Sequence, residues 1–193
     1  GQLDLGRRVL SLGGDHAVTF HVFRAYADRW PDISIVHIDA HPDLHDNFAG
    51  DPLSHASPFA RIMERGLSPR LIQIGIRAST DHQRLQAERF GAQTFGPEDM
   101  AGALACLPTG LVYLTVDLDG LDPSVAPGVN HYEPGGLTAR EVLAVIGAIP
   151  GDLIGADIVE LCPARDHLDM TAKVAAKLAK EIVGKMTSAT SGA

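Results

Sequence analysis

The chain is poor in cysteine and in basic residues, and each shortage argues against a class of protein. Only two of its 193 residues are cysteines, Cys106 and Cys162, and they lie far apart without the spacing of a metal-binding or redox motif. We therefore expect reduced thiols and a cytoplasmic protein. Asp and Glu number 24 against 16 Lys and Arg, and the basic residues form no stripe. The net charge of −8 argues against a nucleic-acid partner.

Long apolar runs are missing as well. No hydrophobic stretch approaches the ~20 residues of a membrane-spanning helix, so we expect no membrane partner. The run "VLSLGG" after Arg7 and Arg8 is too short for a signal peptide. What the chain does have is an ordinary globular balance, with 45% hydrophobic and 21% charged residues, and enough length to bury one core.

Short apolar runs alternate with helical patterns along the chain. The runs that we predict to be strands cover residues 8–12, 33–38, 71–76, 111–118 and 153–161. They are almost continuously hydrophobic, which is typical of parallel strands covered on both faces.

The segments between these strands carry helix start and stop signals. The starts are marked by Ser57 before Pro58, by Thr80 with Gln83, and by Thr138 with Glu141. A last helix is predicted over 169–186, because Met170, Val174, Leu178, Ile182 and Met186 share one face. The pattern predicts an α/β fold: one domain over 1–186, a three-layer sandwich with a central, mostly parallel sheet, and a disordered tail over 187–193.

Ionisable residues gather where the predicted strands end. They are His16, Asp39, His41, Asp43, Asp117, Asp119 and Glu160. The carboxyl ends of parallel strands meet at one rim of a sheet, and this rim is where open α/β sheets bind ligands.

Spacing brings several of these residues to one point. Alternate residues of a strand share a face, so Asp117 and Asp119 should point the same way, as should Asp39 and His41. Pro42 should end its strand and let Asp43 fold back toward them.

A single aspartate here has simpler explanations, either as a solvated loop carboxylate or as a helix cap, and capping accounts for Asp15. Neither explains four carboxylates and two imidazoles converging from three strand ends, which would repel one another without a cation. Six ligands exceed one tetrahedral zinc, so we expect two metal ions. Carboxylate-rich sites of this kind suit manganese, with nickel, cobalt and iron as alternatives. Two such ions can share a bridging hydroxide, which indicates hydrolysis at a carbon or phosphorus centre.

At this point the motifs resemble a known family. "GGDH", "DAHPD", "SHAS", "VDLDGLDPSVAPGV", "EPGGLT" and "DIVELCP" are similar, in order and spacing, to the ureohydrolases, that is, arginase, agmatinase and their relatives. The stretches around "SHAS" and "EPGGL" look closest to the plant-type arginase/agmatinase branch. The resemblance implies an arginase-like fold, a dimanganese site, a small guanidino substrate and homo-oligomers, either trimers or hexamers.

The resemblance also implies roles for single residues. His16, Asp39, Asp43 and Asp117 would bind one ion, and His41 and Asp119, with the shared Asp39 and Asp117, would bind the other. Asp43 would also orient the bridging hydroxide. Glu160 would pair with the substrate guanidinium, although a local salt bridge is the alternative, and His55 would shuttle protons, although a surface or capping histidine is the alternative.

The sequence departs from the family in places. Only twelve residues precede "GGDH", where family members normally have a longer N-terminal segment, so we expect that segment to be absent here and the first predicted strand to have an uncovered edge. Ala17 stands where serine is common. The loop with His45, Asp46 and Asn47 lies where arginases bind the amino-acid end of arginine, which makes His45 and Asn47 candidate substrate-binding residues. His37, His131 and His167 receive no role.

The expected activity is cleavage of agmatine or arginine to urea and an amine by attack of the metal-bridging hydroxide. A guanidine or guanidino-acid hydrolase of the same family is an alternative. The related deacetylases, which use one zinc and fewer carboxylates, fit six ligands less well. A truncated, non-catalytic homologue that keeps its metal site for stability is a further alternative.

Overall fold

The computed structural model describes residues 1–188 and contains one parallel sheet of six strands. The strands are β1 (Val9–Leu12), β2 (Ser34–Ile38), β3 (Leu71–Ile74), β4 (Gln93–Phe95), β5 (Leu111–Asp117) and β6 (Asp152–Val159). Their order across the sheet is β1-β6-β5-β2-β3-β4, and each neighbouring pair is parallel. The parallel sheet predicted from the apolar runs is therefore confirmed.

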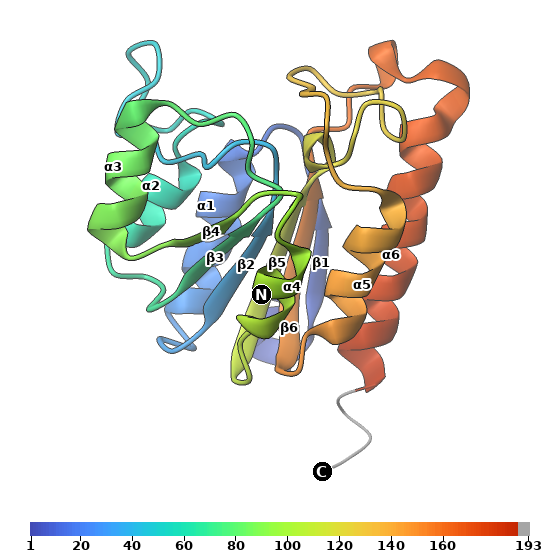
Figure 1. Ribbon diagram of the computed structural model, residues 1–193. Coiled ribbons are helices and arrows are strands. Elements are labelled where there is room, and N and C mark those ends of the chain that lie inside the picture. Colours follow the sequence, from blue (N-terminus) through green and yellow to red (C-terminus); the bar gives the residue numbers. More distant parts are fainter. Residues whose placement is uncertain (189–193) are drawn as a thin grey trace.

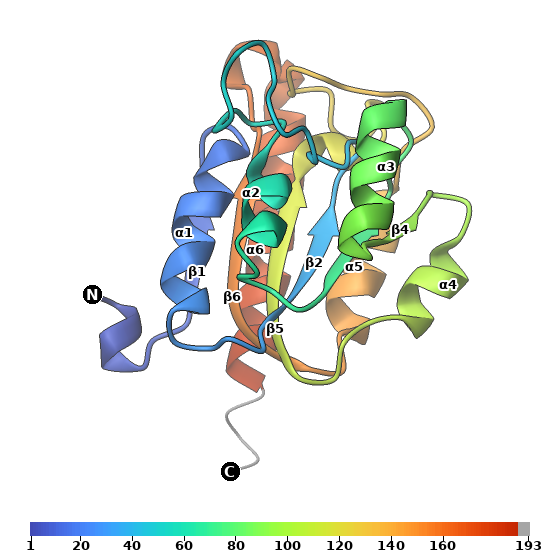
Figure 2. The ribbon, with the colours of Figure 1, turned by 90° about the vertical axis from the view of Figure 1, so that its left-hand side faces the viewer.

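Helices cover both faces of this sheet and make three layers (Figure 1). One face carries α1 (Ala17–Ala27), α2 (Pro58–Glu64) and α3 (Asp81–Phe90), and the other carries α4 (Met100–Ala105), α5 (Ala139–Ala148) and α6 (Met170–Ser188). Figure 2 looks onto the first of these layers, with α2 and α3 in front of the strands. The predicted three-layer α/β sandwich is confirmed.

Each helical layer has its own apolar core. Phe23 of α1 and Phe59 of α2 pack with Tyr113 of the sheet on one face. Val145 of α5 and Ile182 of α6 pack in the core of the other face. Because both faces are covered, the strands show little polar alternation, as expected for a buried parallel sheet.

The helix signals in the sequence mostly act as predicted. Thr80 and Thr138 both form complete capping boxes with the residue three positions on. Ser57 precedes Pro58 as expected, but its side chain makes no capping bond, and its hydroxyl lies 3.2 Å from that of Ser54. The strand β4 was not predicted, because a three-residue, partly exposed stretch carries no apolar run.

Helix α6 runs to Ser188, so the helix continues two residues into the segment predicted to be a disordered tail. Residues 189–193 of that predicted tail lie outside the described residues. Leu178, Ile182 and Met186 are buried on one face as predicted, whereas Met170 at the start is 39% exposed. No helix within residues 1–188 is both long and apolar enough to cross a membrane.

Short helical turns shape the loops at the carboxyl ends of the strands, which lie at the top of Figure 1. Two of them follow strand ends that carry predicted site residues, η2 (Leu118–Gly120) after β5 and η3 (Pro163–Arg165) after β6. The others are η1 (Leu3–Leu5) and η4 (His167–Asp169). At one edge of the sheet, Leu12 of β1 is 73% exposed.

Candidate metal centre

Four of the predicted ligands meet around the imidazole of His16. Its Nδ1 atom lies 3.1 Å from Oδ2 of Asp39, 3.1 Å from Oδ2 of Asp43 and 3.1 Å from Oδ2 of Asp117. All four side chains are buried. The set is the one that the family resemblance implies for the first ion.

The other two predicted ligands form a second group beside the first. Nδ1 of His41 lies 3.2 Å from Oδ2 of Asp119 and 3.4 Å from Oδ1 of Asp39. Asp39 therefore belongs to both groups, with one carboxylate oxygen directed to each. Asp117 has a contact with the first group, while its Oδ1 accepts from the backbone N–H of Asp119 at 2.8 Å, so its bridging role remains a prediction.

The predicted ligands do not all lie on strands, so the alternation of side chains along a strand does not by itself explain how they meet. Strand β2 ends at Ile38, before Asp39, and β5 ends at Asp117, so Asp119 lies in the turn η2 and not on a strand. Asp43 has φ of 51°, in the left-handed region that few non-glycine residues adopt. Backbone strain of this kind gathers at functional sites, and here it turns the Asp43 carboxylate back toward the cluster.

The hydrogen bonds of the two ring nitrogens of His16 show whether the cluster is suited to a cation. Nε2 of His16 lies 2.9 Å from the hydroxyl of Thr115, which itself donates to Asp157 at 2.5 Å. The hydroxyl must therefore accept from Nε2–H, which leaves Nδ1 with a free lone pair facing three carboxylates. Nδ1 is buried and makes no hydrogen bond within residues 1–188. A lone pair surrounded by carboxylate oxygens is repulsive unless a cation or a proton stands between them.

The spacing around His16 also fits an ion. Neighbouring ligands on an octahedral ion with bonds of about 2.2 Å are about 3.1 Å apart, since the separation is the bond length times the square root of two. The three separations from Nδ1 of His16 are each 3.1 Å. The donor set of carboxylates and imidazoles is one that manganese and its neighbours accept.

The electrostatics of the first group reflect three acids packed around one imidazole. Burial and the charges of Asp119 and Asp39 raise the pKa of Asp117 well above its usual value. Burial and the charge of Asp39 raise the pKa of Asp43 to about 7. Burial opposes charge on the His16 ring, but a protonated ring could donate to the nearby carboxylates, and this outweighs burial and raises the pKa of His16 well above its usual value.

The second group shows the same balance. Burial opposes charge on His41, but Asp119 and Asp39 outweigh it and raise the pKa of His41 to about 11. Burial and the charge of Asp39 raise the pKa of Asp119 to about 6. The carboxylates of both groups thus draw positive charge into the site, and divalent cations would supply it.

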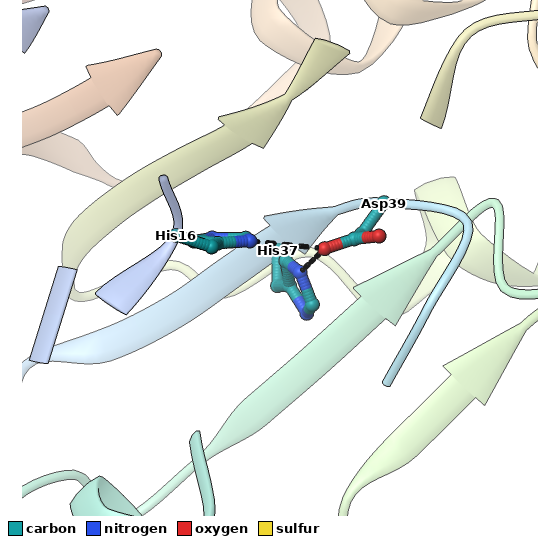
Figure 3. Close-up of side chains that lie close together, drawn as sticks. All are labelled: His16, His37 and Asp39. Atoms are coloured by element: carbon teal, nitrogen blue, oxygen red, sulfur yellow. Dashed lines mark hydrogen bonds and ion pairs between the residues drawn. The ribbon is translucent and has the colours of Figure 1, made fainter. Parts of the chain in front are cut away.

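His37 lies next to these ligands without joining either group. Its Nε2 lies 2.7 Å from Oδ2 of Asp39 (Figure 3). Its other nitrogen lies 3.0 Å from the amide nitrogen of Gln73. Ligand atoms of His37, His16 and Asp39 lie within 4.8 Å of one another, close enough to share an ion. Both ring nitrogens of His37 are already engaged in hydrogen bonds, so we regard it as a partner of Asp39. Burial lowers the pKa of His37 to about 4 and keeps the ring neutral.

Five members of the two ligand groups form the floor of a pocket of about 580 Å³, and the shared Asp39 is buried next to them. The five are His16, His41, Asp43, Asp117 and Asp119. The walls of the pocket come from the loops after β2, β3, β5 and β6, and include His45, Phe48, His55, Ser79, Thr80, Gln83, Asn130, His131, Tyr132, Glu133, Glu160 and Arg165. The structure thus brings the floor and three further predicted site residues, His45, His55 and Glu160, to one cavity.

Glu160 follows the last residue of β6 with φ of 66°, a second strained residue at the site. It is 7% exposed, and its Oε1 accepts from the backbone N–H of His16 at 2.8 Å. No ion pair with Glu160 is found within residues 1–188, so the structure offers no support for the local salt bridge considered as its alternative. Glu160 lines the pocket.

The mouth of the pocket is built from rings. His55 stacks on His131, with centroids 5.2 Å apart and planes 8° from parallel, and also contacts Phe48. His45 stacks on His82 at 5.6 Å. His55 and His45 are thus wall residues, and His131 joins them although no role was assigned to it.

Asn47 does not share the position predicted for it. Its Oδ1 accepts from the backbone N–H of Gly50 at 2.8 Å, and the exposed residue is not among those that line the pocket. The side chain closes its own surface turn, as Asn commonly does, and this geometry does not support substrate binding by Asn47.

Several residues of the site were missed by the sequence analysis. His37 and Thr115 lie two positions before the ligands Asp39 and Asp117, so their shared strand face was a usable signal. Asp157 and Gln73 lie on strands whose order in the sheet was not predicted, and no local sequence pattern links these two residues to the site.

Comparisons with known proteins agree with this geometry. The profile of the arginase family matches residues 2–184. Over 189 residues the chain is 46% identical to the mitochondrial arginase of Medicago truncatula, covering 93% of this chain and 56% of that protein. It is 36% identical to the agmatinase of Bacillus anthracis, covering 94% of this chain and 64% of that protein.

The solved structures lead to the same relatives. The arginase structure from Medicago truncatula superposes with a TM-score of 0.87 at 45% identity, over 93% of this chain and 59% of that one. The agmatine ureohydrolase of Thermoplasma volcanium superposes with a TM-score of 0.86 at 28% identity, over 96% of this chain and 64% of that one. The chain therefore spans little more than half the length of the Medicago protein.

Proposed function

The chain belongs to the arginase family, and from this premise we propose that it is a binuclear manganese hydrolase that releases urea from agmatine or arginine. The observation that carries the proposal is the pair of ligand groups that share Asp39 at the floor of a pocket. A single-zinc deacetylase would not need the second group.

The chain's own residues would hold the ions in two sets. His16, Asp43 and Asp117 would hold one, His41 and Asp119 the other, and Asp39 both. When bound, such ions lower the pKa of water from ~15.7 to about 7 and so supply a nucleophile at neutral pH.

The walls would position the substrate and move protons. Glu160 can accept two N–H groups of a guanidinium in a bidentate pair, which places the guanidinium carbon over the floor. Its hydrogen bond from the His16 backbone keeps the carboxylate at that wall. Asp43 at the floor would orient the attacking water, and His55 at the mouth would carry a proton to the leaving amine.

A guanidino acid is the second candidate substrate. Arg165 lines the same pocket, and a guanidinium side chain is well suited to bind the carboxylate of such a compound. Glu133 lines the pocket too and would suit the ammonium group of agmatine. The two residues thus favour different substrate tails.

A urea-release assay on the manganese-loaded chain tests the proposal, with arginine, agmatine, guanidinobutyrate and guanidine offered separately. We expect urea from agmatine or arginine and none from chain treated with a chelator. Absence of urea with all four compounds, from a chain that binds manganese, would instead make it a non-catalytic homologue. We also propose a homo-oligomer, a trimer or hexamer, which light scattering of the purified chain would test.

A further inference from the structure

A row of polar side chains crosses the sheet one step below the metal-binding rim. Its members occupy partner positions on neighbouring strands, so their side chains lie on the same face. From β1 to β4 the row consists of Ser11, Asp157, Thr115, His37, Gln73 and Thr94. The middle four are fully buried, which is costly for polar groups unless each finds a partner.

The backbone carbonyl of Pro42 shows which atom donates in the hydrogen bond between Gln73 and His37. The backbone oxygen of Pro42 lies 2.7 Å from the side-chain nitrogen of Gln73, and since a carbonyl can only accept, this nitrogen donates. The same nitrogen lies 3.0 Å from Nδ1 of His37, and it has no lone pair with which to accept. Nδ1 of His37 is therefore the acceptor, and the ring proton is on Nε2.

This tautomer directs a donor at Asp39. Nε2–H of His37 donates to Oδ2 of Asp39 at 2.7 Å (Figure 3). The backbone N–H of His41 donates to Oδ1 of Asp39 at 2.6 Å. With one donor on each oxygen, the carboxylate is held in a single plane. Each oxygen keeps a second lone pair, with Oδ2 facing the His16 group and Oδ1 facing the His41 group.

We propose that His37 is a positioning residue of the metal centre: its ring is held by the hydrogen bond from Gln73, and it holds Asp39 across both ligand groups. The inference rests on the metal centre proposed above, but not on the identity of the substrate. Groups that orient a metal ligand in this way change metal affinity when they are removed, typically by about 10–100-fold.

The part of the row formed by Asp157 and Thr115 contacts a different ligand, His16. Asp157 accepts from Thr115, and Thr115 accepts from Nε2–H of His16, which belongs to the first group alone. The two halves should therefore differ. Disturbing His37 or Gln73 should weaken both ions, because Asp39 is shared, whereas disturbing Thr115 should weaken mainly one.

The test is a manganese titration of the full chain, with free Mn²⁺ measured by electron paramagnetic resonance. Gln73→Met keeps the length of the side chain and removes its donor, and His37→Phe removes the ring donor itself. We expect both ions to bind roughly 10–100-fold more weakly in each variant. Thr115→Val should affect one ion more than the other. Thr94→Val is the matched control, because it removes a bond to Oε1 of Gln73 and leaves the Pro42 contact intact.

A second readout addresses the tautomer directly. The ¹⁵N spectrum of the histidine rings in the metal-free chain should show the His37 proton on Nε2 in the wild type and in Thr94→Val. In Gln73→Met we expect the ¹⁵N signal of Nδ1 to shift, because Nδ1 loses its hydrogen-bond donor, while the carboxylate of Asp39 keeps the proton on Nε2. A merely structural role for Gln73 would leave this signal unchanged while lowering the melting temperature.

The outcomes separate the two proposals. Wild-type affinity for both ions in Gln73→Met, or a wild-type His37 proton on Nδ1, overturns the positioning role, and the second result does so even if a variant fails to fold. A wild-type chain that binds two Mn²⁺ but releases no urea removes the proposed activity and leaves His37 in its role. A wild-type chain that binds no Mn²⁺ overturns both.

Discussion

The floor and the mouth of the pocket are built in different ways. At the floor, the fully buried carboxylate of Asp39 accepts hydrogen bonds from the ring of His37 on β2 and from the backbone N–H of His41. At the mouth, the rings of side chains on loops stack on one another, as those of His55 and His131 do. Buried hydrogen bonds from a sheet define one arrangement, whereas loop residues can vary without disturbing it. The difference suggests that the floor sets the chemistry and the mouth sets which molecule is admitted.

The largest expected effect comes from removing the residue shared by the two ligand groups. Asp39→Ala should lose both manganese ions and reduce urea release to the level of the chelated chain, because one oxygen of Asp39 faces each group. Asp119→Ala should weaken mainly the ion near His41. Elemental analysis of dialysed, manganese-loaded protein measures both, and equal losses in the two variants would contradict the arrangement.

A mouth residue should behave in the opposite way, with activity lost and metal kept. His55→Ala should retain both ions and lose roughly 10²–10⁴-fold in kcat, the usual contribution of a general acid–base group. Metal analysis and urea kinetics on the same sample check this. His131→Ala is the control for the stacked partner, and metal loss from His55→Ala would move His55 from the mouth to the floor.

Glu160 stands between the two regions, since it lines the wall but is bonded to the backbone of His16. Glu160→Gln keeps the shape and removes the charge. We expect intact metal content, little change in melting temperature, and a fall of about 10²–10³-fold in kcat/KM, as for the loss of one well-placed electrostatic contact. Near-normal kinetics together with a lower melting temperature would give Glu160 a structural role only.

The smallest expected effect is at Asn47, which closes a surface turn outside the pocket. Asn47→Ala should leave kcat/KM for every substrate within about twofold and change stability by less than ~0.5 kcal/mol, as surface substitutions usually do. His45→Ala, which changes a wall residue of the same loop, is the comparison. A change of substrate preference in Asn47→Ala alone would return Asn47 to the mouth.

How far the sequence could predict the site depends on where each residue stands. Residues at strand ends, such as Asp39 and Asp117, were found because apolar runs mark the strands and parallel strands end at one rim. Asn47 was taken from its place in the family motif, and the loop then directed its side chain into a local turn. Loop conformation depends on contacts that no short pattern encodes, which is why the mouth was predicted less well than the floor.

The sequence by itself determined the alternation of strands and helices, the capping boxes at Thr80 and Thr138, and the residue types gathered at the strand ends. Only the tertiary structure decided which strands are neighbours. The order β1-β6-β5-β2-β3-β4 places Thr115 beside Asp157 and His37 beside Gln73, although each pair is far apart in the chain. The physical reason is that periodicity reports which face a residue lies on, while hydrogen bonds between side chains of different strands depend on strand order and register, which are settled when the whole sheet packs between its helices.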